Sequence, residues 1–514
     1  MYYWRKINII LFIALILLLL PSVVLLLLPG FLTTDDATWM VIRFTAFFDS
    51  LRDGQIPVRV LERLNNGYGY PVANFLYPGF LYVASIIHII GFGFVDSIKI
   101  VLILSMFLSG IFSYVWLKKI FDPYAAFIGS LFYVYTPYHL YDLYTRGSVG
   151  EVMAFACLPF ILWQIERKSL HFIAFGVFIL ILSHNSLALL FFPLIFLYAI
   201  FTKNFLVTLC GGLLGTAMSA FFIIPAIFEL SYTKFSNVNI SNPLEYFASI
   251  QLVGYSSLTV LAVFLISLTM MRRSVKFIPR KGVLSLFFVI FLVSIFLSTE
   301  ISSWLWKIIP SQFIQFPFRA LSLIVVSVAF ISAFILSKLK GMVRLGVALI
   351  LLVVLAYSAM HFINDKSRTN YPDEYYSTNM DTTTVRDEYM PVWVVTKPEK
   401  APSKKIEVVK GNAEVEIITF NSRKVELDLK NSINSTVRIN QIYYPGWNAY
   451  MNYEKIEIEH DNEFGVMDVN VQRGAGRLTL NFEETPIRFL SDVVTVLAII
   501  GGMLLMMRPL LKFK

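Results

Sequence analysis

Long apolar runs alternate with short polar segments over the first 362 residues of the chain. A membrane-spanning helix needs roughly 20 mostly apolar residues, and runs close to that length recur throughout this part. The pattern predicts twelve spanning helices, of which 169–184 and 186–201 are short enough to form a helical hairpin. We expect the helices at residues 7–28, 97–117, 124–138, 150–166, 169–184, 186–201, 205–224, 251–271, 283–299, 319–337, 342–362 and 489–507.

One further apolar run, residues 75–94, is predicted to lie at the membrane interface rather than to cross the bilayer. Its Tyr77, Tyr82 and His88 suit the headgroup region better than the hydrocarbon centre. Basic residues collect in cytoplasmic loops, and this placement puts the basic clusters on one side, with both termini in the cytoplasm. The clusters are Arg5–Lys6, Lys118–Lys119, Arg167–Lys168, Arg272–Lys281, Lys338–Arg344 and Arg508–Lys514.

The pattern changes between residues 363 and 488, where apolar and polar residues alternate. KKIEVVKGNAEVEIITF and RKVELDLK have the period of two that half-buried strands show, and INQIYYPGWNAYMNYEKIEIEH and GRLTLNFEE continue it. We therefore expect a small antiparallel β-domain outside the membrane. The chain then divides into a helical membrane domain (1–362), the β-domain (363–488), and a last helix with a basic tail (489–514).

Composition supports a protein with many membrane spans. The chain of 514 residues is 57% hydrophobic and only 15% charged, whereas soluble domains are about 45–50% apolar and about 25% charged. The net charge of +9 first suggests a nucleic-acid partner, but the basic clusters between the helices account for it, and no nucleic-acid motif is present. The first apolar run is longer than the core of a signal peptide, so we expect a retained helix.

Ionisable residues are nearly absent from the predicted helix centres and gather on the loops predicted to lie outside. Transporters usually carry such groups at mid-membrane, so this distribution argues against transport. The outer loops contribute carboxylates, arginines, histidines and aromatic residues from positions far apart in the sequence. They are Asp35, Asp36, His139, Arg146, Glu151, His184 and Arg319, with Tyr70 in the aromatic stretch 65–78.

These side chains match one reaction beside a bilayer, the transfer of a sugar from a lipid-phosphate donor to an acceptor hydroxyl. A partly desolvated carboxylate, here Asp35 or Asp36, removes the proton of the attacking hydroxyl. Arg146 and Arg319 present the planar fork that binds phosphate. Aromatic side chains such as Tyr70 stack on sugar faces. We expect the substrate-binding residues to be Arg146, Glu151, Arg319, His184, Tyr70 and His139.

Several segments resemble a known family. A long first helix followed by an acidic outer loop is similar to the GT-C superfamily of integral-membrane glycosyltransferases. DDATWMVIRF, GYGYPVANFLYP, TPYHLYDLYTRGSVGE, LSHN and QFPFRAL resemble the bacterial membrane proteins labelled 6-pyruvoyl-tetrahydropterin-synthase-related, a label that implies no pterin chemistry here. YYPGWNAYMN resembles the outer β-domain of a neighbouring GT-C-like family that is implicated in glycosylating cell-envelope polymers.

The resemblance implies an inverting transferase of GT-C type in a prokaryotic cytoplasmic membrane. Its donor would be a polyprenyl-phosphate sugar, and its acceptor a glycan, lipid or protein of the cell envelope. An acidic residue of the first outer loop would be the base, which again indicates Asp35 or Asp36. The family also has an interfacial helix in that loop, in line with the placement of 75–94. The resemblance does not settle whether a divalent metal takes part.

Each candidate residue also has a purely structural interpretation. One of the two aspartates would cap the helix that starts near Ala37, Arg146 and Glu151 would form an ion pair, and Arg319 would snorkel from a helix end. The histidines would be hydrogen-bonded packing residues. Two other functions also stay open for the whole chain: a lipid-linked sugar flippase or polysaccharide exporter, and a non-enzymatic envelope-assembly protein.

Overall fold

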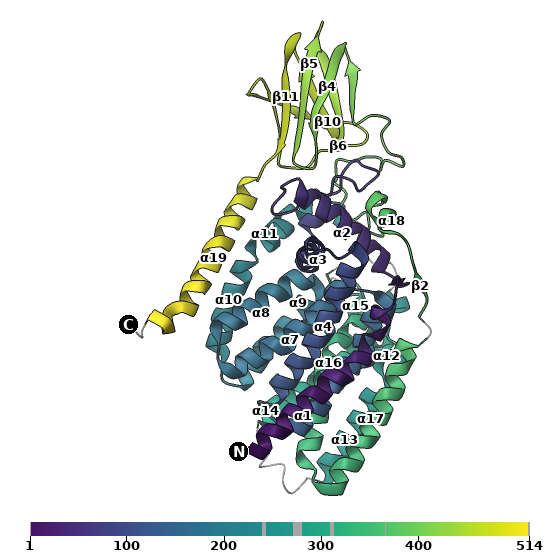
Figure 1. Cartoon of the computed structure of the whole chain (residues 1–514), viewed down its shortest axis with the longest axis vertical. Helices are drawn as coiled ribbons and strands as arrows, with labels where there is room; N and C mark the ends of the chain where they lie inside the picture. Colours follow the sequence, from purple (N-terminus) through teal and green to yellow (C-terminus); the bar gives the residue numbers. More distant parts are fainter. Residues whose placement is uncertain (1, 239–242, 271–279, 309–312, 365, 512–514) are drawn as a thin grey trace.

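A helical body and a smaller β-sandwich make up the molecule (Figure 1). The computed structural model describes residues 2–238, 243–270, 280–308, 313–364 and 366–511. Of the basic clusters expected from the sequence, residues 272–279 of the fourth and residues 512–514 of the last lie outside the described residues. The sandwich sits at one end of the helical body, and the last helix, α19 (Pro486–Leu511), runs back from it along the side of the body (Figure 1).

Six described helices are long and apolar enough to cross a membrane, or seven if one bent pair forms a single span. The expected number of twelve is therefore not confirmed, because several of the expected spans form helices of only 13 to 17 residues. The long helices are α4 (Phe94–Leu117), α7 (Val149–Arg167), α14 (Lys281–Ser298), the turn and helix Pro317–Lys338 that includes α16 (Ser322–Lys338), α17 (Gly341–Ile363) and α19. The shorter apolar ones are α1 (Tyr2–Leu19), α3 (Gly79–Ile89), α5 (Pro123–Tyr135), α8 (Leu170–Ser183), α9 (Asn185–Phe201) and α13 (Tyr255–Met270).

Two of the shorter elements differ from the sequence pattern in a way that shapes the molecule. The single helix expected at 205–224 is broken into α10 (Phe205–Met218) and α11 (Ala220–Phe228), and the pair is bent by 73°. The break lies at Ser219, whose hydroxyl donates to the Gly215 carbonyl and so competes with the helical ladder. The run 75–94 forms only the short α3, which at 11 residues cannot cross a bilayer.

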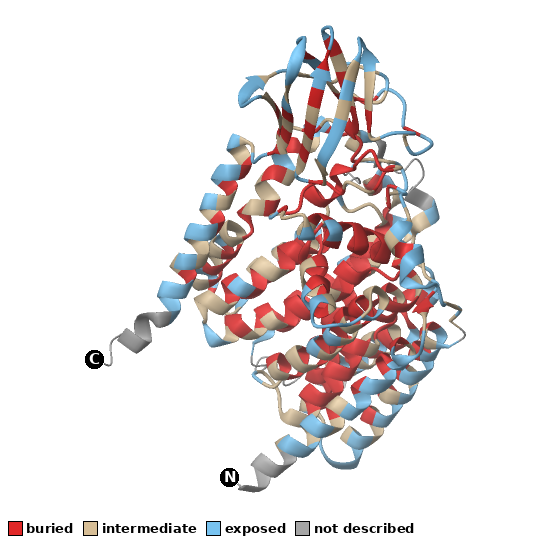
Figure 2. Cartoon of the chain, turned by 45° about the horizontal axis from the view of Figure 1, so that its top comes forward, coloured by how far each residue is buried: buried red, intermediate tan, exposed pale blue. Residues whose placement is uncertain are grey.

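Burial separates the inner helices from the outer ones. The span that includes α16 is 89% buried within the protein, whereas α19 is 11% buried, so the apolar side chains of α19 face outward along most of its length (Figure 2). Outward-facing apolar side chains are what a lipid-contacting helix requires. The bundle therefore has a protein-packed centre and a lipid-facing rim.

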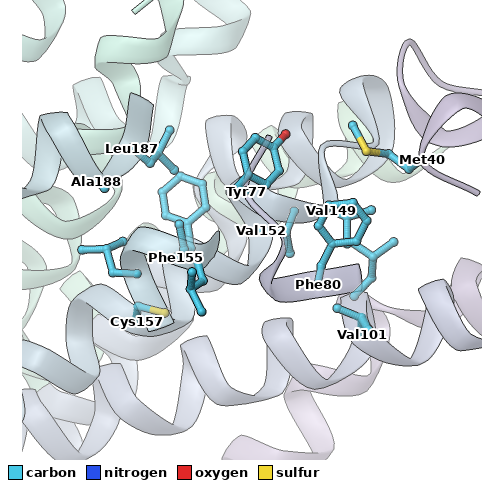
Figure 3. Close-up of a cluster of buried hydrophobic side chains, with 14 of the residues drawn as sticks. Met40, Tyr77, Phe80, Val101, Val149, Val152, Phe155, Cys157, Leu187 and Ala188 are labelled. Atoms are coloured by element: carbon cyan, nitrogen blue, oxygen red, sulfur yellow. The ribbon is translucent and has the colours of Figure 1, made fainter. Parts of the chain in front are cut away.

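A compact apolar cluster from α3, α4, α7 and α9 supports one end of the bundle. Figure 3 shows Tyr77 at the upper edge of this cluster, with its hydroxyl oxygen pointing away from Val152 and Phe155. The cluster fixes the rings and helices on which the polar side chains described below are mounted.

The β-sandwich consists of two antiparallel sheets, with strand orders β3-β6-β10-β9 and β4-β5-β11-β7-β8. The alternation in the sequence is reproduced in β5, where the exposed and buried residues alternate. Trp447 lies in the interior, as a core residue. The strands are β3 (Ile406–Lys410), β4 (Ala413–Phe420), β5 (Lys424–Asn431), β6 (Ser435–Ile442), β7 (Trp447–Met451), β8 (Glu454–Ile456), β9 (Ile458–Glu459), β10 (Val466–Val471) and β11 (Gly474–Phe482).

Residues 366–405 connect α17 to the sandwich and lie over the end of the helical body. Near the start of this segment, β2 (Arg368–Thr369) pairs with β1 (Phe31–Leu32) in front of the acidic loop. The short helix α18 (Asp373–Thr378) follows, and it contacts α2 (Ala37–Arg52). The first strand of the sandwich therefore starts only at Ile406, after a connection that covers the polar end of the bundle.

A buried ion pair joins the helical body to the C-terminal helix. Arg488 of α19 donates two hydrogen bonds of 2.8 Å to Glu229, which follows α11. Tyr444 of the sandwich donates to the same carboxylate at 2.9 Å, and so does the Asn74 amide at 2.8 Å. A paired and hydrogen-bonded carboxylate of this kind fixes orientation more than it adds stability. Four separate parts of the chain therefore meet at Glu229.

Candidate functional site

The acidic loop and the segment 137–151 are bonded to each other through their backbones. The Asp35 amide donates to the Thr145 carbonyl at 3.1 Å, and the Asp36 amide donates to the Arg146 carbonyl at 2.8 Å. Two segments about a hundred residues apart in the chain are thereby held side by side, and Asp36 is placed next to the guanidinium of Arg146.

Neither aspartate caps the following helix, contrary to the structural interpretation offered from the sequence. The cap of α2 is Thr34, whose hydroxyl oxygen accepts from the Ala37 amide at 3.0 Å. Asp36 occupies the position before the helix without a side-chain hydrogen bond to it. Because Thr34 fills the capping role, the carboxylate of Asp36 remains available for other contacts.

Gly147 permits this close approach of the two segments. Its φ is +66°, in the left-handed region, and a Cβ at this position would lie only 2.1 Å from the Thr34 hydroxyl oxygen. A side chain here would therefore be strained by its backbone conformation and would also push the capping threonine and the acidic loop away.

We expect Gly147→Ala to lower the unfolding temperature of the purified protein clearly, because a backbone cost of about 1–2 kcal/mol adds to an overpacking cost of about 1–3 kcal/mol. Gly341→Ala is the matched control, since Gly341 has a φ of +55° but open space where the Cβ would lie. Equal shifts for the two variants would contradict the close approach of Gly147 to Thr34.

Glu151, at the start of α7, is the centre of a buried cluster of charges. Its side chain is fully buried, and it accepts from both Arg146 and Arg319, with Arg319 Nε and Nη2 at 3.0 and 2.8 Å. The Nε2 atom of His184 lies 3.6 Å away, and the Tyr138 hydroxyl donates at 3.3 Å. The ion pair between Arg146 and Glu151 that the sequence allowed is present, and Arg319 shares it.

Asp142 lies beside this cluster, and its surroundings favour the protonated form of its carboxyl group. It is fully buried, and its contact with Arg146 Nη1 is long at 3.3 Å. Burial, and after it the neighbouring Glu151, raises the pKa of Asp142 well above its usual range. Asp142 therefore pairs with Arg146 less strongly than Glu151 does.

A cavity of about 920 Å³ opens next to this cluster. The cavity is lined by Asp36, Arg146 and Arg319, which come from three distant parts of the sequence. Its polar wall comes from α2, from Tyr77, from Arg146, from residues 184–186 and from residues 315–319 and 383–388; its apolar wall comes from α8, α9 and α11. The polar side chains include Asp36, Arg43, Tyr77, Arg146, His184, Asn185, Gln315, Arg319, Thr383, Thr384, Arg386 and Glu388, and the apolar ones include Ile181, Leu189, Phe192, Ile223, Ala226 and Ile227.

An aromatic stack holds the two arginines of the cluster in place. The rings of Phe316 and Phe318 lie 5.1 Å apart and nearly parallel. The guanidinium carbons of Arg146 and Arg319 lie 5.6 and 5.2 Å from the centre of the Phe316 ring. Cation–π contacts of this kind orient a guanidinium without neutralising it. The aromatic residues of QFPFRAL therefore hold the guanidinium groups of Arg146 and Arg319 in position.

Four residues expected at the site from the sequence do not line the cavity. Asp35 is exposed and is not among the lining residues; partial desolvation and the nearby Asp36 raise the pKa of Asp35. Glu151 lies behind the arginines that it binds. Neither Tyr70 nor His139 has any exposed surface, and the structure does not bring either of them to the cavity wall.

The roles of Tyr70 and His139 are visible in their hydrogen bonds. The Tyr70 hydroxyl bonds the Thr384 hydroxyl at 2.8 Å and accepts from the Tyr389 amide at 3.0 Å, which fixes the segment that covers the cavity. The Nδ1 atom of His139 lies 3.0 Å from the Tyr133 carbonyl, and burial lowers the pKa of His139 to about 4. Tyr70 thus supports the site, and His139 is a neutral packing residue.

Arg43 lines the cavity, although the sequence analysis placed it only among the polar residues of the first outer loop and gave it no role. It is only 4% exposed, and it donates to the hydroxyl and the carbonyl of Thr383 at 3.2 and 2.6 Å. Among the described residues no carboxylate lies within ion-pair distance of it. Asp36, Met40 and Arg43 are spaced i, i+4 and i+7 and so share one face of α2; that spacing was the available signal.

Within the described part of the chain, no group of three or more histidine, cysteine or acidic side chains is arranged to hold a metal ion. The question of a divalent metal, open from the sequence, therefore has no candidate site among these residues.

The sequence matches no protein-family model and no curated protein significantly. Among solved structures, the chain is similar to the mycobacterial arabinofuranosyltransferase AftD, with a TM-score of 0.45 and 13% identity over 70% of this chain. A mutant of AftD matches with a TM-score of 0.43 and 14% identity over 69% of this chain. The chain spans about a quarter of the length of these proteins, covering 26% and 27% of them. The more specific family resemblance seen in the sequence motifs is not confirmed.

Proposed function

We propose that this protein is a membrane glycosyltransferase that moves a sugar from a polyprenyl-phosphate-linked donor to an acceptor of the cell envelope. The observation that supports this most is the two-sided cavity. One wall places a carboxylate, Asp36, among arginines, and the other wall is apolar and belongs to the rim of the helical bundle. A substrate with a charged head, a sugar and a long apolar tail fits such a cavity.

The apolar wall is the proposed site of the lipid tail. Leu189 of α9 is 51% exposed and Ile227 of α11 is 65% exposed, although both line the cavity. The cavity thus continues to the apolar outer surface between these two helices. A polyprenyl chain bound there stays in contact with lipid while its phosphate reaches the polar wall.

Arg43 and Arg146 are the proposed phosphate ligands. Arg319 is an unsuitable one, because its donors are already used by Glu151, the Ile314 carbonyl at 2.7 Å and the Gln315 side chain at 3.0 Å. Arg43 has no carboxylate partner among the described residues, and a buried arginine without a counter-ion gains most from binding an anion. The assignment therefore moves from Arg319, as expected from the sequence, to Arg43.

Asp36 is the proposed general base. Its side chain is 35% exposed and lies 3.7 Å from Arg146 Nη2, at the edge of the cavity. In the proposed reaction Asp36 takes the proton of the acceptor hydroxyl, and the oxygen attacks the anomeric carbon from the side opposite the leaving group. The bond between that carbon and the phosphate oxygen breaks, and the polyprenyl phosphate leaves with its negative charge held by the arginines.

The proposed orientation places this cavity at the outer face of a prokaryotic cytoplasmic membrane. The cavity lies at the end of the helical body that carries the β-sandwich, since α2, α11 and the segment 383–389 meet there (Figure 1). Both termini then face the cytoplasm, the sandwich lies outside, and residues 1–362, 363–488 and 489–514 act as membrane domain, outer domain and anchoring helix.

Turnover of defined lipid donors tests the proposal. Purified protein in lipid nanodiscs is incubated with a panel of polyprenyl-phosphate sugars and an envelope extract as acceptor, and release of polyprenyl phosphate is measured. We expect release for at least one donor, and loss of release in Asp36→Asn. A flippase would instead move the intact donor across liposomes with or without Asp36, and that result would overturn the enzymatic proposal.

We expect Arg43→Gln to raise the KM for the lipid donor by about 10- to 100-fold, since a hydrogen bond to a charged group contributes about 1.5–3 kcal/mol. The measurement is donor-dependent initial rates in nanodiscs. Arg52→Gln, on the exposed end of the same helix, is the control and leaves the donor KM unchanged. An Arg43→Gln variant with a normal donor KM would contradict the proposed phosphate site.

A further inference from the structure

A second, smaller cavity of about 240 Å³ lies beside the main one. Thr383 and Thr384 line both cavities, so only this short stretch of chain separates them. The second cavity is on the side of α2 that carries Trp39, whereas Asp36, Met40 and Arg43 face the main cavity. Its lining residues are Trp39, Asn65, Asn66, Met380, Asp381, Thr382, Thr383, Thr384 and Lys397.

The lining contains an unpartnered polar atom that is fully buried. Asn65 is 1% exposed, and its side-chain oxygen has no hydrogen-bond partner among the described residues. Its amide group makes only long contacts, at 3.5 Å to the Gly69 carbonyl and 3.9 Å to the Met390 sulfur. A buried acceptor without a donor costs about 1–3 kcal/mol, so a bound ligand that turns this oxygen toward the cavity and donates to it would relieve that cost.

The walls of the second cavity are held rigidly. The Asn66 amide donates to the Met380 carbonyl at 2.8 Å, which joins the first loop to the connecting segment. Asp387 accepts from the Thr382 hydroxyl at 2.6 Å and from Lys397 Nζ at 2.7 Å, which fixes the turn that follows. The cavity is thus formed by cross-links between distant segments, as a prebuilt binding site requires.

The chemistry of the walls favours a single sugar ring. The cavity is smaller than the about 300–1,000 Å³ of sites for larger ligands, and it has a tryptophan, two asparagines, threonines and a carboxylate. Trp39 is 38% exposed. Sugars present one apolar face that stacks on an aromatic ring and a rim of hydroxyls that pair with amides and carboxylates. Phosphate is disfavoured, because Lys397 is already paired with Asp387.

We propose that this second cavity binds one sugar unit of the acceptor, so that the acceptor is a glycan rather than a lipid or a protein. This inference rests on the proposed transferase function, because only a transferase has an acceptor. The unit held by Trp39 and Asn65 positions the neighbouring unit across Thr383 and Thr384, with its hydroxyl toward Asp36. The segment 382–384 is thereby a guide between the two binding sites.

Saccharide binding to the full-length protein in nanodiscs tests the proposal directly. The probes are the methyl glycosides of glucose, mannose, galactose and N-acetylglucosamine, and binding is followed by saturation-transfer NMR. We expect at least one glycoside to bind, and Trp39→Leu to weaken it about 2- to 10-fold, the range that an aromatic contact supplies. Trp304→Leu is the control, because Trp304 is 57% exposed elsewhere on the helical body. Absence of binding by all four, or equal binding by both variants, overturns the proposal.

Kinetics distinguish failure of this inference from failure of the proposed function. In a working transfer assay, Trp39→Leu raises the acceptor KM while the donor KM stays unchanged; an unchanged acceptor KM would overturn the sugar site and leave the transferase standing. Conversely, glycoside binding that depends on Trp39 in a protein that never releases polyprenyl phosphate supports the sugar site and overturns the transferase.

Discussion

Asp36→Asn lowers the rate of sugar transfer by about 100- to 10,000-fold, the contribution of a positioned general base. The substitution keeps the size of the side chain and removes its ability to accept a proton. Asparagine at this position leaves the cap of α2 in place, because Thr34 forms it, and Arg146 keeps its contact with Glu151 when the one with Asp36 is lost. The measurement is kcat with saturating lipid donor, together with the unfolding temperature, which we expect to stay close to that of the wild type.

Asp35→Asn is the matched control for this prediction. It removes the same charge one residue earlier, but Asp35 does not line the cavity. We expect this variant to keep most of the wild-type rate. Equal losses in both variants would mean that the loop acts through its overall charge, and a fully active Asp36→Asn would remove Asp36 as the base.

Glu151→Gln destabilises the protein by about 3–5 kcal/mol, the usual cost of removing one partner from a buried ion pair. The change leaves Arg146 and Arg319 close together without the carboxylate that they share. Both arginines are buried, at 6% and 2% exposure, so water cannot replace the lost contacts. The measurement is the midpoint of thermal unfolding of the purified protein, followed by size-exclusion chromatography after heating.

The double variant Glu151→Gln/Arg319→Gln separates the charge effect from simple loss of packing. Removing one arginine together with the carboxylate restores the charge balance around Arg146. We therefore expect the double variant to unfold at a higher temperature than Glu151→Gln alone, which is the non-additive behaviour of residues in contact. Additive losses would contradict the shared pairing at Glu151.

The strands were predictable from the sequence to a large extent. The segments 404–420 and 423–430 contain β3, β4 and β5. In β5 every second residue is buried, as a strand with one buried face requires, whereas β4 has no buried residue. β10 (Val466–Val471) was not singled out, although VMDVNV alternates in the same way. The alternation of apolar and polar residues predicts single strands, but it does not predict which strands pair with each other.

The number of spans was not predictable in the same way, since apolar runs do not reveal where a helix breaks. At Ser219 the run of apolar residues continues on both sides, yet one helix ends and another begins, whereas the break near His184 was expected from the sequence. A hydropathy pattern measures how apolar a segment is, whereas helix ends depend on local hydrogen bonds such as that from Ser219 to Gly215.

The site was predictable in part, for a related reason. Asp36, Arg146 and Arg319 were recognised as chemically suitable, but only the backbone bonds to Thr145 and Arg146 show which aspartate faces the cavity. Arg43 was noted among the polar residues of the first loop but was given no role, because its place in the proposed site comes from lacking a carboxylate partner among the described residues. Whether a carboxylate lies near Arg43 depends on how distant segments pack together, and the sequence of one segment does not show this.

The contact between α11 and the last helix has a consequence for biosynthesis. α11 supplies Ile223 and Ile227 to the apolar wall, and it is held by α19 through the bond from the Phe221 amide to the Thr495 hydroxyl at 2.8 Å and through Arg488. A ribosome makes α19 more than 250 residues after α11, at about 5–20 residues per second. For many seconds, the nascent chain therefore contains Asp36, Arg146 and Arg319 before α11 receives its contacts from α19, so the apolar wall of the cavity is the last part of it to be completed.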